Sequence, residues 1–135
     1  MKAVIDTNIL VSSLFTPTGV SSKALKLIMD YGRIIYDSRI MTEYNLVLHR
    51  DKFGFKEQDV CGLLDFIRLN GTNLPNPVPL PLSKFKDRHD APFMETAVSA
   101  QADFLITGNK KHFPKSLAGS VKIISPGDFL LGNDA

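Results

Sequence analysis

Four short apolar runs alternate with longer amphipathic segments along this chain of 135 residues, and this alternation limits the possible folds more than any other feature. No short polar turn of the β-hairpin type joins one run to the next, so consecutive runs are expected to be parallel strands connected by helices. The runs cover residues 3–5, 33–36, 104–107 and 121–124. The sequence therefore predicts a three-layer α/β/α fold with a central parallel sheet of about four to five strands, in a single domain over residues 1–135.

The segments between the runs predict the helices and one irregular connection. Apolar residues recur at helical spacing, and polar or glycine residues stand where helices begin and end. A different pattern occurs in residues 74–82, where four prolines favour an extended surface connection with room for a short edge strand. The helices are expected at residues 9–15, 20–31, 38–48 and 56–69, from Asp90 onward, and as a last turn after Ser125.

The composition excludes several classes of protein. Hydrophobic residues make up 44% of the chain and charged residues 22%, as in ordinary globular proteins, and no apolar stretch is long enough to cross a membrane. The N-terminus lacks the apolar region of a signal peptide, so a cytoplasmic protein is expected. Cys61 is the only cysteine, which excludes an intrachain disulfide, and it is expected to pack as a small hydrophobic residue.

Polar residues follow two of the apolar runs directly. Asp6 comes after the first run, and the third run leads into Thr107, Gly108 and Asn109. In a parallel sheet these positions meet at the carboxyl edge, where ligands of open α/β folds bind. The alternative is that Asp6 only caps the helix that follows it.

Two helices carry further carboxylates near their buried sides. Glu43 lies about 40° from Val47 on a helical projection, so it flanks the apolar stripe, although an ordinary boundary glutamate would do the same. Asp90 lies on the interior side of its helix, with helix capping as the alternative. Glu95 points away from that side and is expected to be solvated or to support the site from outside, and Asp87 is a looser candidate.

Three carboxylates in one crevice would repel one another unless a cation joined them. Asp6, Glu43 and Asp90 therefore point to an oxygen-ligand site for Mg²⁺ or Mn²⁺. The net charge of +2 is too small to indicate a nucleic-acid binder. Basic residues nevertheless cluster next to Asp90 and after Asn109, and they would contact a polyanion bound at this site.

Four segments in order resemble the PIN-domain nucleases, and among them the bacterial toxins of toxin–antitoxin systems. The segments are Val-Ile-Asp-Thr-Asn-Ile-Leu at residues 4–10, Glu43, Asp-Ala-Pro-Phe-Met-Glu-Thr-Ala at 90–97, and Ala-Asp-Phe-Leu-Ile-Thr-Gly-Asn at 102–109. The resemblance implies a PIN-like fold and Mg²⁺- or Mn²⁺-dependent cleavage of RNA. Asp6, Glu43 and Asp90 are then the catalytic metal ligands.

The resemblance also implies partners and supporting residues. Asn8 and Thr107 would hold ligands or water through hydrogen bonds, and Arg88, Lys110 and Lys111 would contact RNA. Single-stranded RNA is the expected substrate, because the chain has no long basic helix for a duplex groove. The expected protein partners are a cognate antitoxin and a second copy of the chain in a homodimer.

Asn109 departs from the family pattern, because many members carry a fourth acid there. An amide oxygen can still accept a hydrogen bond, but the substitution removes one negative charge from the site. An alternative function is therefore a PIN-fold module with weakened catalysis that binds nucleic acid or protein. A receiver module or a haloacid-type phosphatase would need a second acid close after Asp6, where the chain has Thr7 and Asn8.

Overall fold

The apolar runs form one parallel sheet in the computed structural model, which describes residues 1–132. Every neighbouring pair of strands is parallel, as predicted, and the order across the sheet is β3-β2-β1-β4-β5. The edge strand β3 pairs with β2 and lies just before the proline-rich connection, not inside it. The strands are β1 (Lys2–Ile5), β2 (Arg33–Tyr36), β3 (Thr72–Asn73), β4 (Phe104–Ile106) and β5 (Lys122–Ile124).

The predicted helices are present, with ends that differ by a few residues at most. Asp37 caps α3 by accepting a hydrogen bond from the backbone of Ile40 at 2.9 Å, and Ser125 caps α6 in the same way. The helices are α1 (Thr7–Phe15), α2 (Val20–Tyr31), α3 (Ser38–Leu48), α4 (Glu57–Asn70), α5 (Ala91–Ser99) and α6 (Pro126–Leu131). Short 3₁₀ turns are η1 (Asp51–Phe53), η2 (Leu82–Lys84), η3 (Arg88–Asp90), η4 (Lys110–His112) and η5 (Lys115–Leu117).

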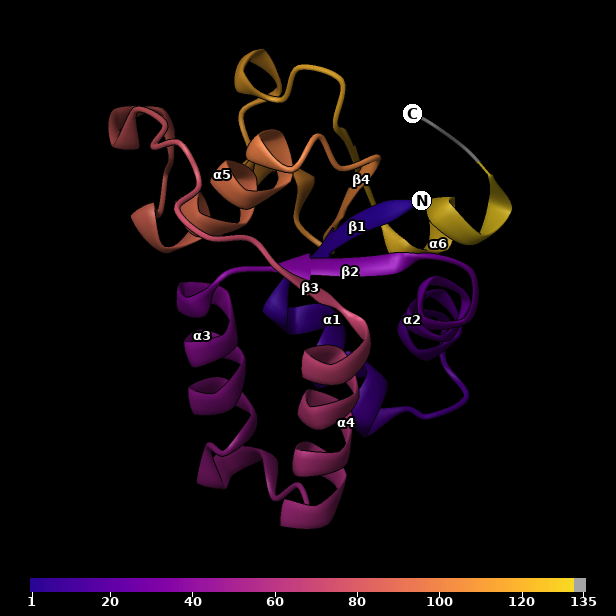
Figure 1. Ribbon diagram of the computed structural model, residues 1–135. Coiled ribbons are helices and arrows are strands. Elements are labelled where there is room, and N and C mark those ends of the chain that lie inside the picture. Colours follow the sequence, from indigo (N-terminus) through magenta and orange to yellow (C-terminus); the bar gives the residue numbers. More distant parts are fainter. Residues whose placement is uncertain (133–135) are drawn as a thin grey trace.

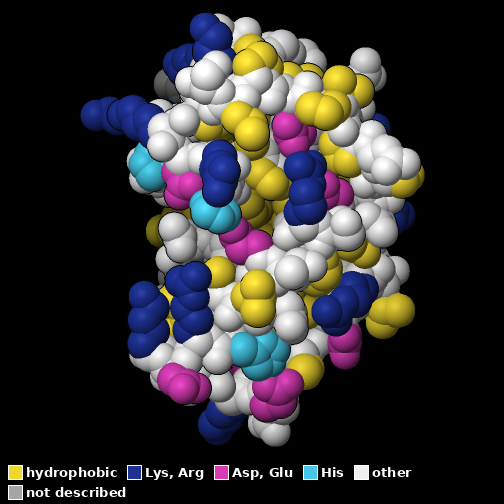
Figure 2. Space-filling view, turned by 90° about the vertical axis from the view of Figure 1, so that its left-hand side faces the viewer, with side chains coloured by type: hydrophobic (Ala, Val, Ile, Leu, Met, Phe, Trp, Pro, Cys, Tyr) yellow, Lys and Arg dark blue, Asp and Glu magenta, His cyan; other side chains and the backbone are white. Residues whose placement is uncertain are grey.

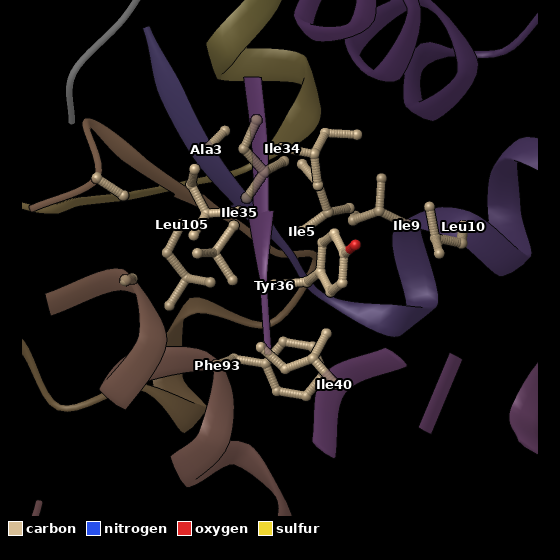
Figure 3. Close-up of a cluster of buried hydrophobic side chains, with 14 of the residues drawn as sticks. Ala3, Ile5, Ile9, Leu10, Ile34, Ile35, Tyr36, Ile40, Phe93 and Leu105 are labelled. Atoms are coloured by element: carbon tan, nitrogen blue, oxygen red, sulfur yellow. The ribbon is translucent and has the colours of Figure 1, made fainter. Parts of the chain in front are cut away.

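Helices cover both faces of the sheet. Helix α5 packs on one face against β1, β2 and β4, and α1 to α4 lie on the other side (Figure 1). Strands β1, β2, β4 and β5 are buried apart from their first residues, and their side chains meet those of the helices, as Figure 3 shows for Ile35, Leu105 and Phe93. Cys61 is not part of this core, so the prediction that it packs as a small hydrophobic residue is wrong.

The order of the strands places a crevice beside β1. The chain runs from β1 outward to β2 and β3, and then crosses to β4 on the opposite side of β1. The carboxyl ends of β1 and β4 are joined by a hydrogen bond of 2.9 Å from the backbone N–H of Asp6 to the carbonyl of Ile106. Ligands of open α/β sheets bind at such a change of direction.

No helix within residues 1–132 is both long enough and apolar enough to cross a membrane.

Candidate functional site

Asp6 is held at the carboxyl end of β1 by its neighbour on β4. Its Oδ2 accepts a hydrogen bond of 2.7 Å from Oγ1 of Thr107, and that Oγ1 accepts one of 3.0 Å from the backbone N–H of Asn109. Thr107 is fully buried and Asp6 is 9% exposed. The Asp6 side chain makes no capping hydrogen bond to α1, so helix capping does not explain this residue.

Glu43 reaches the same edge of the sheet from α3. Its Oε2 accepts a hydrogen bond from Oγ1 of Thr7, the residue that follows Asp6. Glu43 is partly exposed, while Tyr44 beside it is buried and donates a hydrogen bond to the carbonyl of Ile5 on β1. The buried tyrosine therefore anchors α3 against the end of β1, which places Glu43 next to the Asp6 turn.

Asp90 completes the group from the last residue of η3. Its side chain makes no capping hydrogen bond to α5, so the capping alternative is wrong here as well. The Oδ2 atom of Asp90 is buried and lies 3.3 Å from Nδ1 of His112, but it has no partner with hydrogen-bond geometry among the described residues. A buried carboxylate oxygen without a donor is costly unless a cation or a proton reaches it.

The carboxylates are close enough for the charges of Asp6 and Glu43 to act on Asp90. Burial, the largest cause, and the negative charges of Asp6, Asp87 and Glu43 together raise the pKa of Asp90 to about 6, against the opposing effect of His112. Burial also raises the pKa of Asp6, although the hydrogen bond from Thr107 opposes this effect. Protons and metal ions compete for such a site, because either one neutralises the clustered charge.

The donor set fits a hard divalent cation. All three acids supply oxygen, and Oδ2 of Asp90 accepts no hydrogen bond from residues 1–132, although Nδ1 of His112 lies 3.3 Å away. Within residues 1–132 the oxygens of the three acids do not all lie within 4.8 Å of one another. Mg²⁺ retains several water molecules and binds through one or two carboxylates in many sites, so direct ligation by all three acids at once is not required.

His112 is a site residue that the sequence analysis placed only in a basic cluster. Its Nδ1 faces Asp90, and its Nε2 accepts a hydrogen bond of 2.9 Å from Nδ2 of Asn109 in this assignment of the amide. Asn109 is exposed, and its side chain binds this histidine. The spacing of three residues between Asn109 and His112 could have predicted this contact, because a 3₁₀ turn brings positions three residues apart together.

The remaining predicted residues are Asn8, Arg88, Lys110 and Lys111. Within residues 1–132, the side chains of Asn8, Arg88 and Lys111 form no hydrogen bond or ion pair with the carboxylates of the three acids. Asn8 is exposed in the first turn of α1, and Arg88 is exposed in η3, two residues before Asp90. Lys110 and Lys111 lie in η4, where Lys111 is exposed and Nζ of Lys110 is 3.9 Å from Oδ2 of Asp128.

A groove of about 680 Å³ adjoins the acidic site. Figure 2 shows this side of the molecule, where hydrophobic side chains lie in a hollow surrounded by acidic, basic and histidine side chains. Residues of α3, the proline-rich connection and the start of α5 form the groove. Glu43 lies on its wall, together with Arg50 and Arg88.

Glu95 was expected to be solvated or to support the site from outside, and the structure excludes the first of these alternatives. It is 4% exposed, and its carboxylate accepts hydrogen bonds of 2.7 Å each from Nη1 of Arg39 and from the backbone N–H of Leu80. The helical projection could not show that the proline-rich connection covers this side chain of α5. Glu95 therefore fixes this connection on α5, and it also lines the groove, as Glu43 does.

Comparisons with known proteins agree with this architecture. A family model described as PIN domain matches residues 2–111. The chain is similar to a chain in the crystal structure of VapBC2 from Rickettsia felis bound to a DNA fragment from their promoter, at 16% identity and a TM-score of 0.63 over 93% of this chain and 98% of that one. It is similar at 16% identity and a TM-score of 0.62, with the same coverage, to a chain in the structure of VapBC-1 from nontypeable Haemophilus influenzae. No curated protein matches the chain significantly.

Proposed function

This chain belongs to the PIN domain family, and from that membership and its acidic crevice we propose that it is a divalent-metal-dependent endoribonuclease that cleaves single-stranded RNA. The observation that carries the proposal is the convergence of Asp6, Glu43 and Asp90 at the carboxyl ends of β1 and β4, with a buried oxygen of Asp90 lacking a donor. This is the arrangement that a cation would complete.

Each acid has a defined part in the proposed mechanism. Asp6, Glu43 and Asp90 would hold Mg²⁺ or Mn²⁺, which lowers the pKa of a bound water and neutralises charge on the scissile phosphate. Thr107 orients the carboxylate of Asp6, and Thr7 orients that of Glu43, through the hydrogen bonds described above. His112 faces Asp90 and can hold or donate a proton beside the site.

The surroundings of the crevice support an RNA substrate. Arg88 borders the groove next to Asp90, and Lys111 is exposed in the turn after β4, so both can contact phosphates. We propose that Lys110, in the same turn, contacts RNA phosphates as well. The apolar side chains of the groove offer surfaces for unstacked bases, which only a single strand presents.

We also propose that the chain is the toxin of a toxin–antitoxin system, acts in the cytoplasm and forms a homodimer. The support is the common fold with chains of two structures titled VapBC2 and VapBC-1. The antitoxin would be a separate protein that covers the acidic crevice. Exposed apolar side chains such as Leu69, which is 82% exposed, and Leu46, which is 65% exposed, are available for contacts between subunits.

The proposal is tested with purified full-length protein and a fluorescent single-stranded RNA in Mn²⁺, Mg²⁺ or EDTA. We expect cleavage with either metal, none in EDTA, and a loss of at least about 100-fold in rate for Asp90→Asn, since a metal ligand is removed. Asp59→Asn, an exposed change in the first turn of α4, is the matched control and should cleave normally.

Two results would contradict the proposal. Equal cleavage by the wild type and Asp90→Asn would identify a contaminating nuclease. RNA binding without cleavage by the wild type would favour the binding module with weakened catalysis, for which the amide at Asn109 is the supporting observation.

A further inference from the structure

A second group of metal-ligating side chains lies where α3 ends and α4 begins, at residues outside the acidic crevice. It consists of His49, Glu57 and Cys61. Nε2 of His49 is 2.7 Å from Oε2 of Glu57, and Sγ of Cys61 donates a hydrogen bond of 3.0 Å to Oε1 of the same carboxylate. One ligand atom from each residue lies within 4.8 Å of the other two.

The histidine is already oriented toward this group. Its Nδ1 lies 2.7 Å from the carbonyl oxygen of Asn45, so Nδ1 is the nitrogen that carries a proton and donates it to this backbone acceptor. Nε2 points at the carboxylate of Glu57 and donates to it while the ring is charged, so a metal ion would bind Nε2 in place of this proton. Histidines that bind metals are commonly held in this way, with the second ring nitrogen donating to a backbone carbonyl.

The backbone that brings the three residues together is well supported. Phe53 and Phe55 in the connection stack with their ring centroids 5.4 Å apart, and Phe15 of α1 packs edge-on against Phe55 at 4.7 Å. Glu57 and Cys61 are one helical turn apart on α4, so they share a face. Binding of an ion would therefore need only small side-chain movements.

The donor set differs in kind from that of the acidic crevice. One imidazole nitrogen, one carboxylate oxygen and one sulfur suit Zn²⁺, which binds nitrogen and sulfur ligands in tetrahedral geometry, whereas Mg²⁺ and Mn²⁺ prefer oxygen alone. Three protein ligands leave the fourth position for water or for an external group.

We propose that His49, Glu57 and Cys61 form a Zn²⁺ site that is separate from the acidic crevice. The ion joins the end of α3 to the start of α4 and stabilises their packing. Helix α3 also carries Glu43 and one wall of the groove, so the zinc site holds that wall in position.

The test uses the full-length chain with Asp6→Asn and Asp90→Asn, which weaken metal binding in the acidic crevice. Titration with Co²⁺, the spectroscopic substitute for Zn²⁺, is expected to give one bound ion per chain with a sulfur-to-cobalt charge-transfer band, and Zn²⁺ should remove the band. In this background Cys61→Ser should abolish the band and lower the Zn²⁺ affinity by about 100-fold or more, and His49→Gln should lower the affinity similarly.

Asp65→Asn is the matched control, because Asp65 lies one turn beyond Cys61 on α4 and pairs with Arg68 at 2.9 Å. It should bind Co²⁺ and Zn²⁺ as the background does. Thermal unfolding in EDTA checks that every variant is folded, and added Zn²⁺ should raise the melting temperature of the background but not that of Cys61→Ser. The proposal is overturned if Cys61→Ser binds Zn²⁺ as tightly as the background, or if bound Co²⁺ shows no sulfur band.

Discussion

At the scale of single residues, Asp90 is placed for ligand binding at a cost to stability. Its carboxyl group has a pKa of about 6 in the folded chain, against 3.8 for an unperturbed group, chiefly because it is buried. The folded chain therefore holds the proton of Asp90 more tightly than the unfolded chain does. Without metal, the contribution of this group to the free energy of unfolding must fall as pH rises from about 4 to about 6.

Replacing Asp90 by asparagine should relieve this cost. In EDTA at pH 7 we expect Asp90→Asn to be more stable than the wild type by on the order of 2 kcal/mol, after allowance for the partial exposure of the side chain. Below pH 4 the difference should largely disappear, because Asp90 is then protonated. Denaturant unfolding at both pH values measures this difference in stability. If Asp90→Asn were less stable than the wild type at pH 7, Asp90 would stabilise the folded chain.

Thr107 is expected to control how Asp6 binds metal. Thr107→Val removes the hydroxyl that donates to Asp6 and accepts from the backbone N–H of Asn109. We expect a fall of about 10-fold to 100-fold in Mn²⁺ affinity, measured by calorimetry, and a loss of about 1–2 kcal/mol in stability.

Thr96→Val provides the control for this change. Thr96 on α5 is also fully buried, but its hydroxyl has no hydrogen-bond partner among the described residues. The same substitution there should leave Mn²⁺ affinity unchanged and should not lower stability. If Thr107→Val and the wild type bound Mn²⁺ with equal affinity, Thr107 would have no role in metal binding by Asp6.

At the scale of elements, the junction of α4 and the sheet depends on a close approach at Gly71. A Cβ atom at this position would lie 2.5 Å from the carbonyl oxygen of Ile67 and 2.8 Å from that of Ile34 on β2. We expect Gly71→Ala to lower the free energy of unfolding by about 2 kcal/mol or more, because backbone must move to relieve the overlap.

Gly62 on the same helix makes the comparison direct. Nothing lies within 4 Å of a Cβ atom there, so Gly62→Ala should raise stability by about 0.5–1 kcal/mol through helix propensity. Urea unfolding of both variants gives the two values. If both variants changed the free energy of unfolding in the same direction, the close contact at Gly71 would not explain the effect of Gly71→Ala.

At the scale of the whole molecule, the acidic crevice joins parts of the chain that are far apart in sequence. Asp6 follows β1, Glu43 lies on α3, and Asp90 precedes α5, so an ion bound to all three acids stabilises only the folded arrangement. Mn²⁺ at about 100 times its dissociation constant should add about 2.7 kcal/mol to the stability of the wild type. The melting temperature should rise accordingly, and Asp6→Asn should show a much smaller rise. An equal rise in both would place the bound ion elsewhere.

Local patterns in the sequence were sufficient to predict the elements and the layers. Apolar runs, helical periodicity and capping residues act over a few residues, so they located four of the strands, the helices and the parallel sheet that the structure confirms, but not the short exposed strand β3. The topology rule for parallel sheets then placed Asp6 next to Thr107, as the hydrogen bond between them confirms.

Contacts between distant segments were decided only by the tertiary structure. A helical projection shows on which side Glu95 lies, but not that the proline-rich connection covers that side and buries the carboxylate against Leu80. It likewise cannot show that His112 faces Asp90, or that Cys61 meets His49 across a turn held by stacked phenylalanines. Periodicity depends on the geometry of one element, whereas these contacts depend on how different elements pack together. The separation of two such residues along the sequence does not reveal that they are in contact.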